Sequence, residues 1–302
     1  MVAQVASAKT RLPFISHVSF ADDSFMALPL RVLQEFATEW RMHCGLPFAV
    51  YGVIPNYVSP EKVEVLTWAG MNRVRMGIQS GSAAILDFYE RPSPPKRVLS
   101  AAATLASFSP KYHIPPAYDI ITDNPIETRQ DVVDTLRLVY KLDRPFTLYL
   151  YALKVIPNTR LARVLQSRGT ELGAIDESYL VIPPRWANLL LYLLCLLKPP
   201  GWVFELLIKP VRASGEIQCE YRTLGLVLRT CYVLKRVSQH LRFLDFSILP
   251  GRFGYVLWRV GLLGWWHRHA QRRADRLYPD GIPPNPRVRD GQSQSGSALG
   301  PM

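Results

Sequence analysis

The stretch Arg73-Val74-Arg75-Met76-Gly77-Ile78-Gln79-Ser80-Gly81-Ser82 carries the clearest structural signal in this chain. Residues 73–78 predict a short buried strand, and Gln79 and Ser80 stand where that strand ends. Ser82 can cap a helix that begins directly afterwards, and the glycines permit a tight turn between the two elements. A buried strand, a polar strand end and a helix form the repeating unit of a parallel α/β fold.

The same unit recurs through the first 160 residues. The predicted strands are residues 18–20, 48–53, 73–78, 118–122 and 146–155. A helical pattern follows each of them, as expected because parallel neighbours must be joined by helical crossovers. The sequence therefore predicts an α/β fold, either a parallel barrel or a doubly wound sheet. In both folds, ligands bind at the carboxyl ends of the strands.

Helix start and stop signals lie between the predicted strands. Residues 27–43 carry apolar side chains at three- and four-residue spacing, which is typical of an amphipathic helix. Gly70 can end the helix that Ser59 begins, and Thr128 with Asp131 resembles a capping box. The candidate N-cap residues are Ser59, Ser82, Thr128 and Thr159. Caps directly behind strand ends leave backbone N–H groups facing one surface, a geometry that receives anions and nucleotide-like ligands.

Charge divides the chain into two unlike parts. The 302 residues are 48% hydrophobic and carry a formal net charge of +12. Residues 181–302 hold 17 Lys and Arg against 7 Asp and Glu, a balance of +10, which leaves +2 for residues 1–180. A near-neutral part suits an enzyme domain, whereas a basic and apolar part suits contact with anionic lipid. We do not expect nucleic acid to be a partner.

Three strand ends carry polar side chains that suit ligand binding. Asp22 and Asp23 follow the first strand, Gln79 and Ser80 follow the third, and residues 119–128 run through the end of the fourth. Each of these ends also has a purely structural interpretation as a helix cap or a turn. Their occurrence in order behind three strands favours a shared ligand site.

Together these segments resemble the radical S-adenosylmethionine family, and in particular its cobalamin-associated branch. FADDSF (20–25) is similar to the family's acidic strand end, and GIQSGS (77–82) to its Gly-Ile-Glu/Gln-Ser-Gly-Ser turn. DNPIET (123–128) resembles a Gly-x-Pro-Gly-Glu-Thr turn, with Asp123 and Ile126 in place of the glycines. IPNTRL (156–161) resembles the family's proline-x-threonine close. The resemblance covers about residues 14–168, roughly half of the chain.

The resemblance implies a fold, a reaction and contact residues. The fold is a partial (β/α)6 barrel that lacks its first βα unit, and the reaction is reductive cleavage of S-adenosylmethionine to a 5′-deoxyadenosyl radical. By position, Asp22 or Asp23 would approach the methionyl ammonium group. Gln79 and Ser80 would lie near the ribose or carboxylate, and the backbone at Ile121 and Asn124 near the adenine. These contacts orient the cofactor, and no side chain is assigned a catalytic role.

The iron–sulfur ligands that the resemblance implies are missing from the sequence. The family holds a [4Fe-4S] cluster on Cys-x3-Cys-x2-Cys, and no such triplet occurs in this chain, so we assign it no metal ligand. The cysteines are Cys44, Cys195, Cys219 and Cys231, whose spacing favours reduced thiols in the cytoplasm. We expect the cluster, and any cobalamin-binding domain, on an upstream segment or a partner subunit. A mis-assigned start, a split gene and a decayed copy are the alternatives.

The remaining sequence predicts two further regions after the barrel-like region 1–170. Residues 171–278 predict a helical basic and apolar region, and residues 279–302 a disordered tail rich in Pro, Gly, Ser and Gln. The apolar run 186–197 is too short to span a bilayer and stops at Pro199 and Pro200. Three interpretations stay open for residues 181–278, namely helices lying in a membrane surface, a helical subdomain packed on the barrel, or a re-entrant hairpin.

Two function hypotheses follow. The first is a radical S-adenosylmethionine enzyme, or a truncated part of one, that acts on a lipid or isoprenoid substrate and is inactive as an isolated chain. The second is a non-catalytic scaffold or partner subunit that retains a barrel remnant at a membrane. Both predict a cytoplasmic protein that is peripheral at the inner face of the membrane. A hydrolase or an aldolase is disfavoured because no nucleophile, strand-end lysine or metal-ligand set accompanies Asp22 and Asp23.

Overall fold

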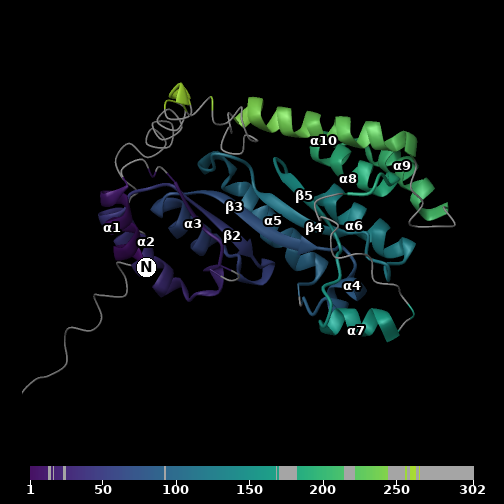
Figure 1. The fold of residues 1–302 in the computed structure, drawn as a ribbon, viewed down its shortest axis with the longest axis horizontal. Coiled ribbons are helices and arrows are strands. Elements are labelled where there is room, and N and C mark those ends of the chain that lie inside the picture. The colour runs from purple at the N-terminus through teal and green to yellow at the C-terminus, as the bar shows by residue number, and fades with distance from the viewer. Residues whose placement is uncertain are drawn as a thin grey trace, which may run out of the picture.

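A parallel five-stranded sheet forms the centre of the molecule, which we describe from a computed structural model. The structure describes residues 1–12, 15, 17–22, 25–91, 93–167, 169, 182–213, 222–243, 256, 259–262 and 265. The strands are β1 (Val18–Phe20), β2 (Phe48–Val53), β3 (Met71–Gln79), β4 (Ala117–Thr122) and β5 (Thr147–Ala152). They lie side by side in chain order, and every neighbouring pair is parallel (Figure 1). The predicted α/β fold with parallel strands is therefore confirmed.

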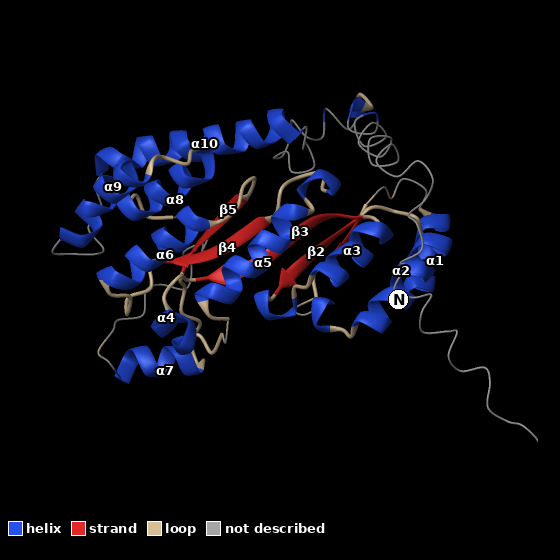
Figure 2. Ribbon diagram, turned by 180° about the vertical axis from the view of Figure 1, so that it is seen from behind, coloured by secondary structure: helices blue, strands red, loops and turns tan. Residues whose placement is uncertain are grey.

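Helices cover one face of this sheet. The helices are α1 (Val2–Arg11), α2 (Leu30–His43), α3 (Pro60–Ala69), α4 (Ala83–Phe88), α5 (Pro95–Ser107), α6 (Arg129–Lys141), α7 (Arg160–Ser167), α8 (Trp186–Leu196), α9 (Gly201–Ala213) and α10 (Arg222–Phe243). Sequential parallel strands joined by right-handed crossovers place their connecting helices on the same side. In agreement, α2, α3, α5, α6 and α8 each contact the next helix in that order. Figure 2 shows the strands and the surrounding helices from behind.

The two faces of the sheet differ in chemistry. Val74, Met76 and Ile78 of β3 are buried beneath the helices, as are Tyr118 and Ile120 of β4. Most of the residues that alternate with them are only half-buried, and most of these are polar. We call this second side the polar face, and its members are Arg75, Gln79, Asp119, Tyr149 and Tyr151. The sheet is thus amphipathic, with a helix-covered core on one side.

The capping signals in the sequence are confirmed in the structure. The Ser59 hydroxyl accepts a hydrogen bond from the backbone N–H of Lys62, and Gly70 ends α3 in the left-handed region at φ 115°. Thr128 and Asp131 form the predicted capping box at the start of α6. These local contacts fix where the helices begin behind the strands, and so they set the positions of the strand-end loops.

The second half of the chain packs onto the sheet. The core that includes the strands also includes α8, which contacts β5 and α6 and is covered by α10. This arrangement agrees with the helical-subdomain interpretation of this region. The helix α9 continues through Pro210 to Ala213. Among the described helices, none has the length and apolar character that crossing a bilayer requires.

Several predictions fall on residues that the structure leaves out. Asp23 and Cys219 lie outside the described residues, as does the predicted tail 279–302. The division of the chain at residues 170 and 278 stays a prediction.

Candidate functional site

The ends of β3 and β4, which carry several of the predicted cofactor contacts, are neighbours in the sheet. Gln79 pairs with Ile120 in the parallel register of the two strands, so GIQSGS and DNPIET leave the sheet side by side. Both segments turn sharply as they leave. Gln79 adopts φ 69° and Asp123 φ 61°, a left-handed conformation that is uncommon for residues other than glycine and often marks functional sites.

The serines of the first segment are bonded to the start of α6. The Ser80 and Thr135 hydroxyls lie 3.1 Å apart, and Thr135 Oγ1 accepts a hydrogen bond from the backbone N–H of Gly81 at 2.9 Å. Ser82 Oγ donates to Asp131 at 2.5 Å. Ser80 is fully buried, so its hydroxyl braces the turn and does not face a pocket. The predicted contact of Ser80 with a cofactor is untested and would require the loss of these bonds.

Asn124 also makes internal contacts. Its side chain is buried, and Nδ2 donates to the Tyr89 hydroxyl at 3.0 Å. Its Oδ1 accepts from the backbone N–H of Ile126 at 3.0 Å. The amide therefore shapes the loop after β4 and joins it to the residue that follows α4. The predicted role of Asn124 concerned its backbone near an adenine, and that role stays a prediction.

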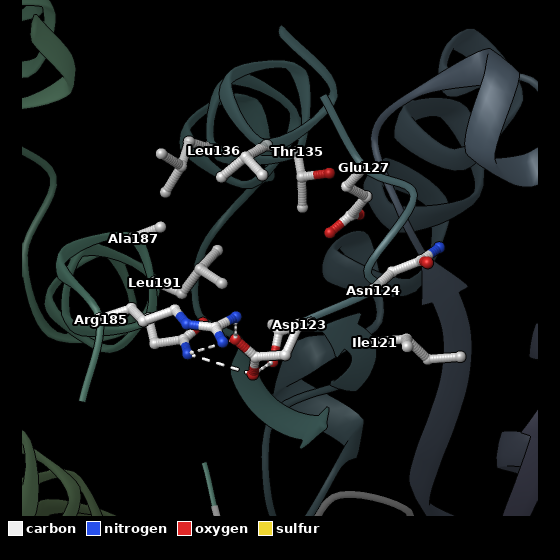
Figure 3. A pocket seen from close by; sticks show the side chains of 12 residues that line it. Ile121, Asp123, Asn124, Glu127, Thr135, Leu136, Arg185, Ala187 and Leu191 are labelled. Atoms are coloured by element: carbon white, nitrogen blue, oxygen red, sulfur yellow. Dashed lines mark hydrogen bonds and ion pairs between the residues drawn. The ribbon is translucent and has the colours of Figure 1, made fainter. Parts of the chain in front are cut away.

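A small cavity of about 40 Å³ lies at the carboxyl end of β4. A cavity of this size holds a few water molecules or the edge of a ligand. Figure 3 shows the side chains of α6 and α8 on its sides and the loop after β4 between them. The residues that line it are Ile121, Thr122, Asp123, Asn124, Glu127, Val132, Thr135, Leu136, Arg185, Ala187, Asn188 and Leu191. Two of the predicted residues, Ile121 and Asn124, thus meet at this cavity.

An ion pair connects the start of α8 to this strand end. Arg185 Nη1 donates to Asp123 Oδ1, and both side chains are largely buried. Asn188 Nδ2 lies 3.3 and 3.4 Å from the two Asp123 oxygens and donates to the Pro183 carbonyl at 3.0 Å. Charge-assisted bonds of this kind are strong where water is excluded. Sequence reasoning missed Arg185 and Asn188, which stand at the N-cap and in the first turn of the apolar helix.

Glu127 lines the cavity and has an unusually high pKa. Burial raises the pKa of Glu127 to about 8, and the nearby carboxylates of Asp123 and Asp131 act in the same direction. Arg185 opposes the shift without cancelling it. A carboxyl group in this state is protonated at neutral pH and can donate a hydrogen bond into the cavity. Sequence reasoning assigned Glu127 only to the turn motif.

A second polar cluster occupies the polar face below the strand ends. Arg75 Nε donates to both carboxylate oxygens of Asp119, at 2.7 and 2.9 Å, and Arg75 Nη2 donates to the Tyr151 hydroxyl. The Arg75 guanidinium carbon lies 4.6 Å from the centroid of the Tyr149 ring. Lys235 of α10 lies 5.1 Å from the same centroid. The signal for this cluster was present in the sequence, because polar residues alternate with apolar ones in the predicted strands.

Gln79 is the last residue of β3 and follows Arg75 by four residues on the polar face. A Cβ placed on Gly77 would come within 2.5 Å of Gln79 Nε2, so the amide folds back over the glycine on the polar face. Gly77 is in register with Asp119 of the next strand. The amide has no hydrogen-bond partner among the described residues, and it is therefore available to a ligand.

The aspartates predicted after β1 are only partly described. Asp22 is exposed behind β1, and β1 is separated from β3 by β2. One strand therefore lies between the strand that precedes Asp22 and the strand that carries Gln79. Asp23 lies outside the described residues. The prediction that either carboxylate meets a methionyl ammonium group stays untested.

The described cysteines do not fit an iron–sulfur cluster. Cys44 follows α2 and approaches the Val2 carbonyl, whereas Cys195 belongs to α8 and Cys231 to α10. Burial raises the pKa of Cys195 to about 11 and that of Cys44 above its ordinary value, so the thiolates that a cluster requires are disfavoured. In the part of the chain that the structure describes, no three Cys, His, Asp or Glu side chains are grouped to hold a metal ion.

Comparisons with known proteins give distant structural matches. No protein-family model and no curated protein sequence matches the chain. One solved structure that matches is HemN, the coproporphyrinogen III oxidase of Escherichia coli, described as a radical SAM enzyme, with a TM-score of 0.45 and 15% identity over 59% of this chain. Another is Elp3 of the archaeon Methanocaldococcus infernus lacking residues 1–46, with a TM-score of 0.43 and 15% identity over 78% of this chain. The matches span 41% and 59% of the lengths of HemN and Elp3, respectively.

Proposed function

We propose that this chain is the S-adenosylmethionine-binding part of a radical S-adenosylmethionine-type enzyme. The observation that carries the proposal is the pairing of β3 and β4, which brings two segments that resemble family motifs to one edge of the sheet. The edge also carries the Gln79 amide at the end of β3 and, around one cavity at the end of β4, an acid that is protonated at neutral pH and a buried ion pair. Ligands of parallel α/β folds bind at this edge.

The residues present suit the nucleoside part of the cofactor. The free Gln79 amide offers both a donor and an acceptor to ribose hydroxyls or to the carboxylate. Since the cavity is small, an adenine ring would lie above Ile121, with only its edge entering toward Glu127. When S-adenosylmethionine is bound, it supplies a sulfonium whose reductive cleavage gives the 5′-deoxyadenosyl radical. This chain would bind and orient the molecule.

Direct titration tests the binding proposal. We expect isothermal titration of the full chain with S-adenosylmethionine to give saturable binding, and Gln79→Ala to weaken it by about tenfold through the loss of hydrogen bonds to a polar ligand. Gln166→Ala, which removes an exposed amide on α7, is the matched control and should bind as the wild type does. Equal affinity for the wild type and Gln79→Ala would exclude the proposed site.

The electron source is proposed to lie on another polypeptide segment. The described cysteines are dispersed, so the chain itself does not supply a cluster site among its described residues. We expect anaerobic treatment with iron and sulfide to leave the isolated chain without a cluster and without 5′-deoxyadenosine production. A partner subunit or an upstream segment with Cys-x3-Cys-x2-Cys would supply the cluster and with it 5′-deoxyadenosine production.

The proposed substrate is a lipid or isoprenoid at the inner face of the membrane, in keeping with the apolar and basic second half.

A non-catalytic scaffold is the second candidate. It is favoured because side chains of the motifs form hydrogen bonds within the protein. The hydroxyls of Ser80 and Ser82 and the Asn124 amide all stabilise the turns in this way. A scaffold would keep these bonds without binding S-adenosylmethionine. The titration therefore separates the candidates, because a stable folded chain that shows no saturable binding supports the scaffold.

A further inference from the structure

Large apolar side chains are exposed along α10. This helix packs on α8 and lies at the outside of the molecule (Figure 1). Isolated exposed apolar residues are ordinary, but several on one helix indicate an interaction surface. The exposed apolar residues of α10 are Leu226, Val227, Tyr232, Val233, Leu234 and Val237.

The helical repeat places part of this set directly opposite the buried side. Leu228, Cys231 and Lys235 are buried, and their spacing of three and four residues marks the side of α10 that packs inward. At 100° per residue, Leu226 and Val233 lie on the far side of the helix, as does Val237. Their exposed fractions are 76%, 53% and 44%. The outward side of α10 is therefore apolar where an ordinary surface helix is polar.

Positive charge adjoins these apolar residues. Arg229 is exposed beside them, between the positions of Leu226 and Val233. The residues seven positions before and after it are also arginines, Arg222 and Arg236. Residues 181–302 as a whole carry a balance of +10. We call Leu226, Arg229, Val233 and Val237 the outer face of α10.

We propose that the outer face of α10 binds the surface of a bilayer that contains anionic lipids. Its apolar side chains would enter the boundary between headgroups and acyl chains, and Arg229 would pair with lipid phosphate. A second copy of the chain fits this surface less well, because each copy would bring its own exposed Arg229 and its own positive second half to the interface. The buried helix α8 takes no part in this contact, in contrast to the sequence-based interpretation in which the whole region 181–278 meets the membrane.

Vesicle sedimentation with the full chain tests the proposal. We expect the wild type to sediment with vesicles of phosphatidylcholine and phosphatidylglycerol and to be released by salt. The triple variant Leu226→Gln/Val233→Gln/Val237→Gln should lower the partition coefficient by at least about tenfold, because the apolar area for insertion is lost. Arg229→Gln should lower it about fivefold on these vesicles and leave binding to pure phosphatidylcholine unchanged.

Matched controls make the result decisive. Val32→Gln/Met42→Gln/Ile156→Gln removes three exposed apolar side chains away from α10 and should sediment as the wild type does. Circular dichroism verifies that each variant is folded. Equal partition coefficients for the wild type and the α10 triple variant would overturn the proposal. So would wild-type dimerisation, detected by light scattering, that the α10 triple variant abolishes without any change in vesicle binding. These outcomes do not depend on whether the chain binds S-adenosylmethionine.

Discussion

Gly81 lies where the turn after β3 touches α6. A Cβ at this position would come within 2.5 Å of the Asp134 carbonyl oxygen and 2.6 Å of Thr135 Cα, both of which are backbone atoms that cannot move aside cheaply. We expect Gly81→Ala to lower the free energy of unfolding by about 2 to 3 kcal/mol through overpacking. Urea denaturation measures this change.

A helical glycine with space around it provides the control for Gly81. A Cβ added to Gly225 in α10 would meet only the Pro184 Cβ, at 3.8 Å, and Gly225 has no positive φ. Gly225→Ala should therefore stabilise the protein by about 0.5 to 1 kcal/mol, since alanine favours a helix more than glycine does. A destabilisation of similar size in both variants would show that the close approach at Gly81 is not the cause.

Glu127 makes the stability of the protein depend on pH. Its pKa is raised from 4.5 to about 8 in the folded chain, so the folded state holds a proton that the unfolded state releases above pH 4.5. The contribution of this proton to the free energy of unfolding is complete below pH 4.5 and is lost as the pH rises toward 8. Over that range the free energy of unfolding falls by up to about 1.4 kcal/mol per pH unit. We expect Glu127→Gln to flatten that decline in urea denaturation series at several pH values. Parallel pH profiles for the two proteins would refute the buried-acid assignment.

The sequence predicted the polar strand-end residues better than their roles. Gln79 and Ser80 are consecutive in GIQSGS, yet the amide of one is free and the hydroxyl of the other is buried against α6. Strand periodicity places neighbouring side chains on opposite faces, but a left-handed residue at the strand end disturbs that alternation. The packing of α6 therefore decides which of the two side chains is available to a ligand, and this packing cannot be predicted from the local sequence.

At the scale of elements, α8 is joined to the strand end of β4 by a buried ion pair. We expect Arg185→Ala to lower the free energy of unfolding by about 3 to 5 kcal/mol, because Asp123 would remain buried without its cation. Chemical denaturation gives the value. Arg185→Ala with Asp123→Asn should recover part of the loss, and failure to recover any would contradict the ion-pair interpretation.

An ion pair between two helices serves as the comparison. Arg137 of α6 and Glu205 of α9 approach to 3.2 Å, but their side chains are 39% and 47% exposed. Water and salt screen such a pair, so Arg137→Ala should cost less than about 1 kcal/mol. A cost for Arg137→Ala equal to that of Arg185→Ala would show that burial does not set the strength of these contacts.

Local signals predicted the strands and the capped helices because their caps and turns are encoded within a few residues. α3 begins after Ser59 and ends at Gly70, as its sequence predicts. α1 was not predicted, because its sequence lacks a capping side chain and none of its residues is buried. α9 continues through Pro210 because its packing on α6 compensates for the backbone hydrogen bond that proline cannot donate. A rule that treats proline as the end of a helix does not take this tertiary packing into account.

At the scale of the whole molecule, the two halves share one core, and the polar face lies opposite the helix layer. The sequence predicted the parallel order of the strands from their helical connections. It did not predict the Arg75–Asp119 pair with its tyrosines, because residues on three strands meet only in the sheet register. The polar face therefore places a charged and aromatic surface directly below the edge at which S-adenosylmethionine is proposed to bind.

Photolabelling tests the central claim most directly, because it locates the bound cofactor on the chain. The full protein is irradiated with an azidoadenine analogue of S-adenosylmethionine, digested and examined by mass spectrometry. The account predicts label on peptides that contain residues 77–82 or 119–128, and loss of that label when excess S-adenosylmethionine is present. Label confined to other peptides, or label that excess S-adenosylmethionine does not displace, would contradict it.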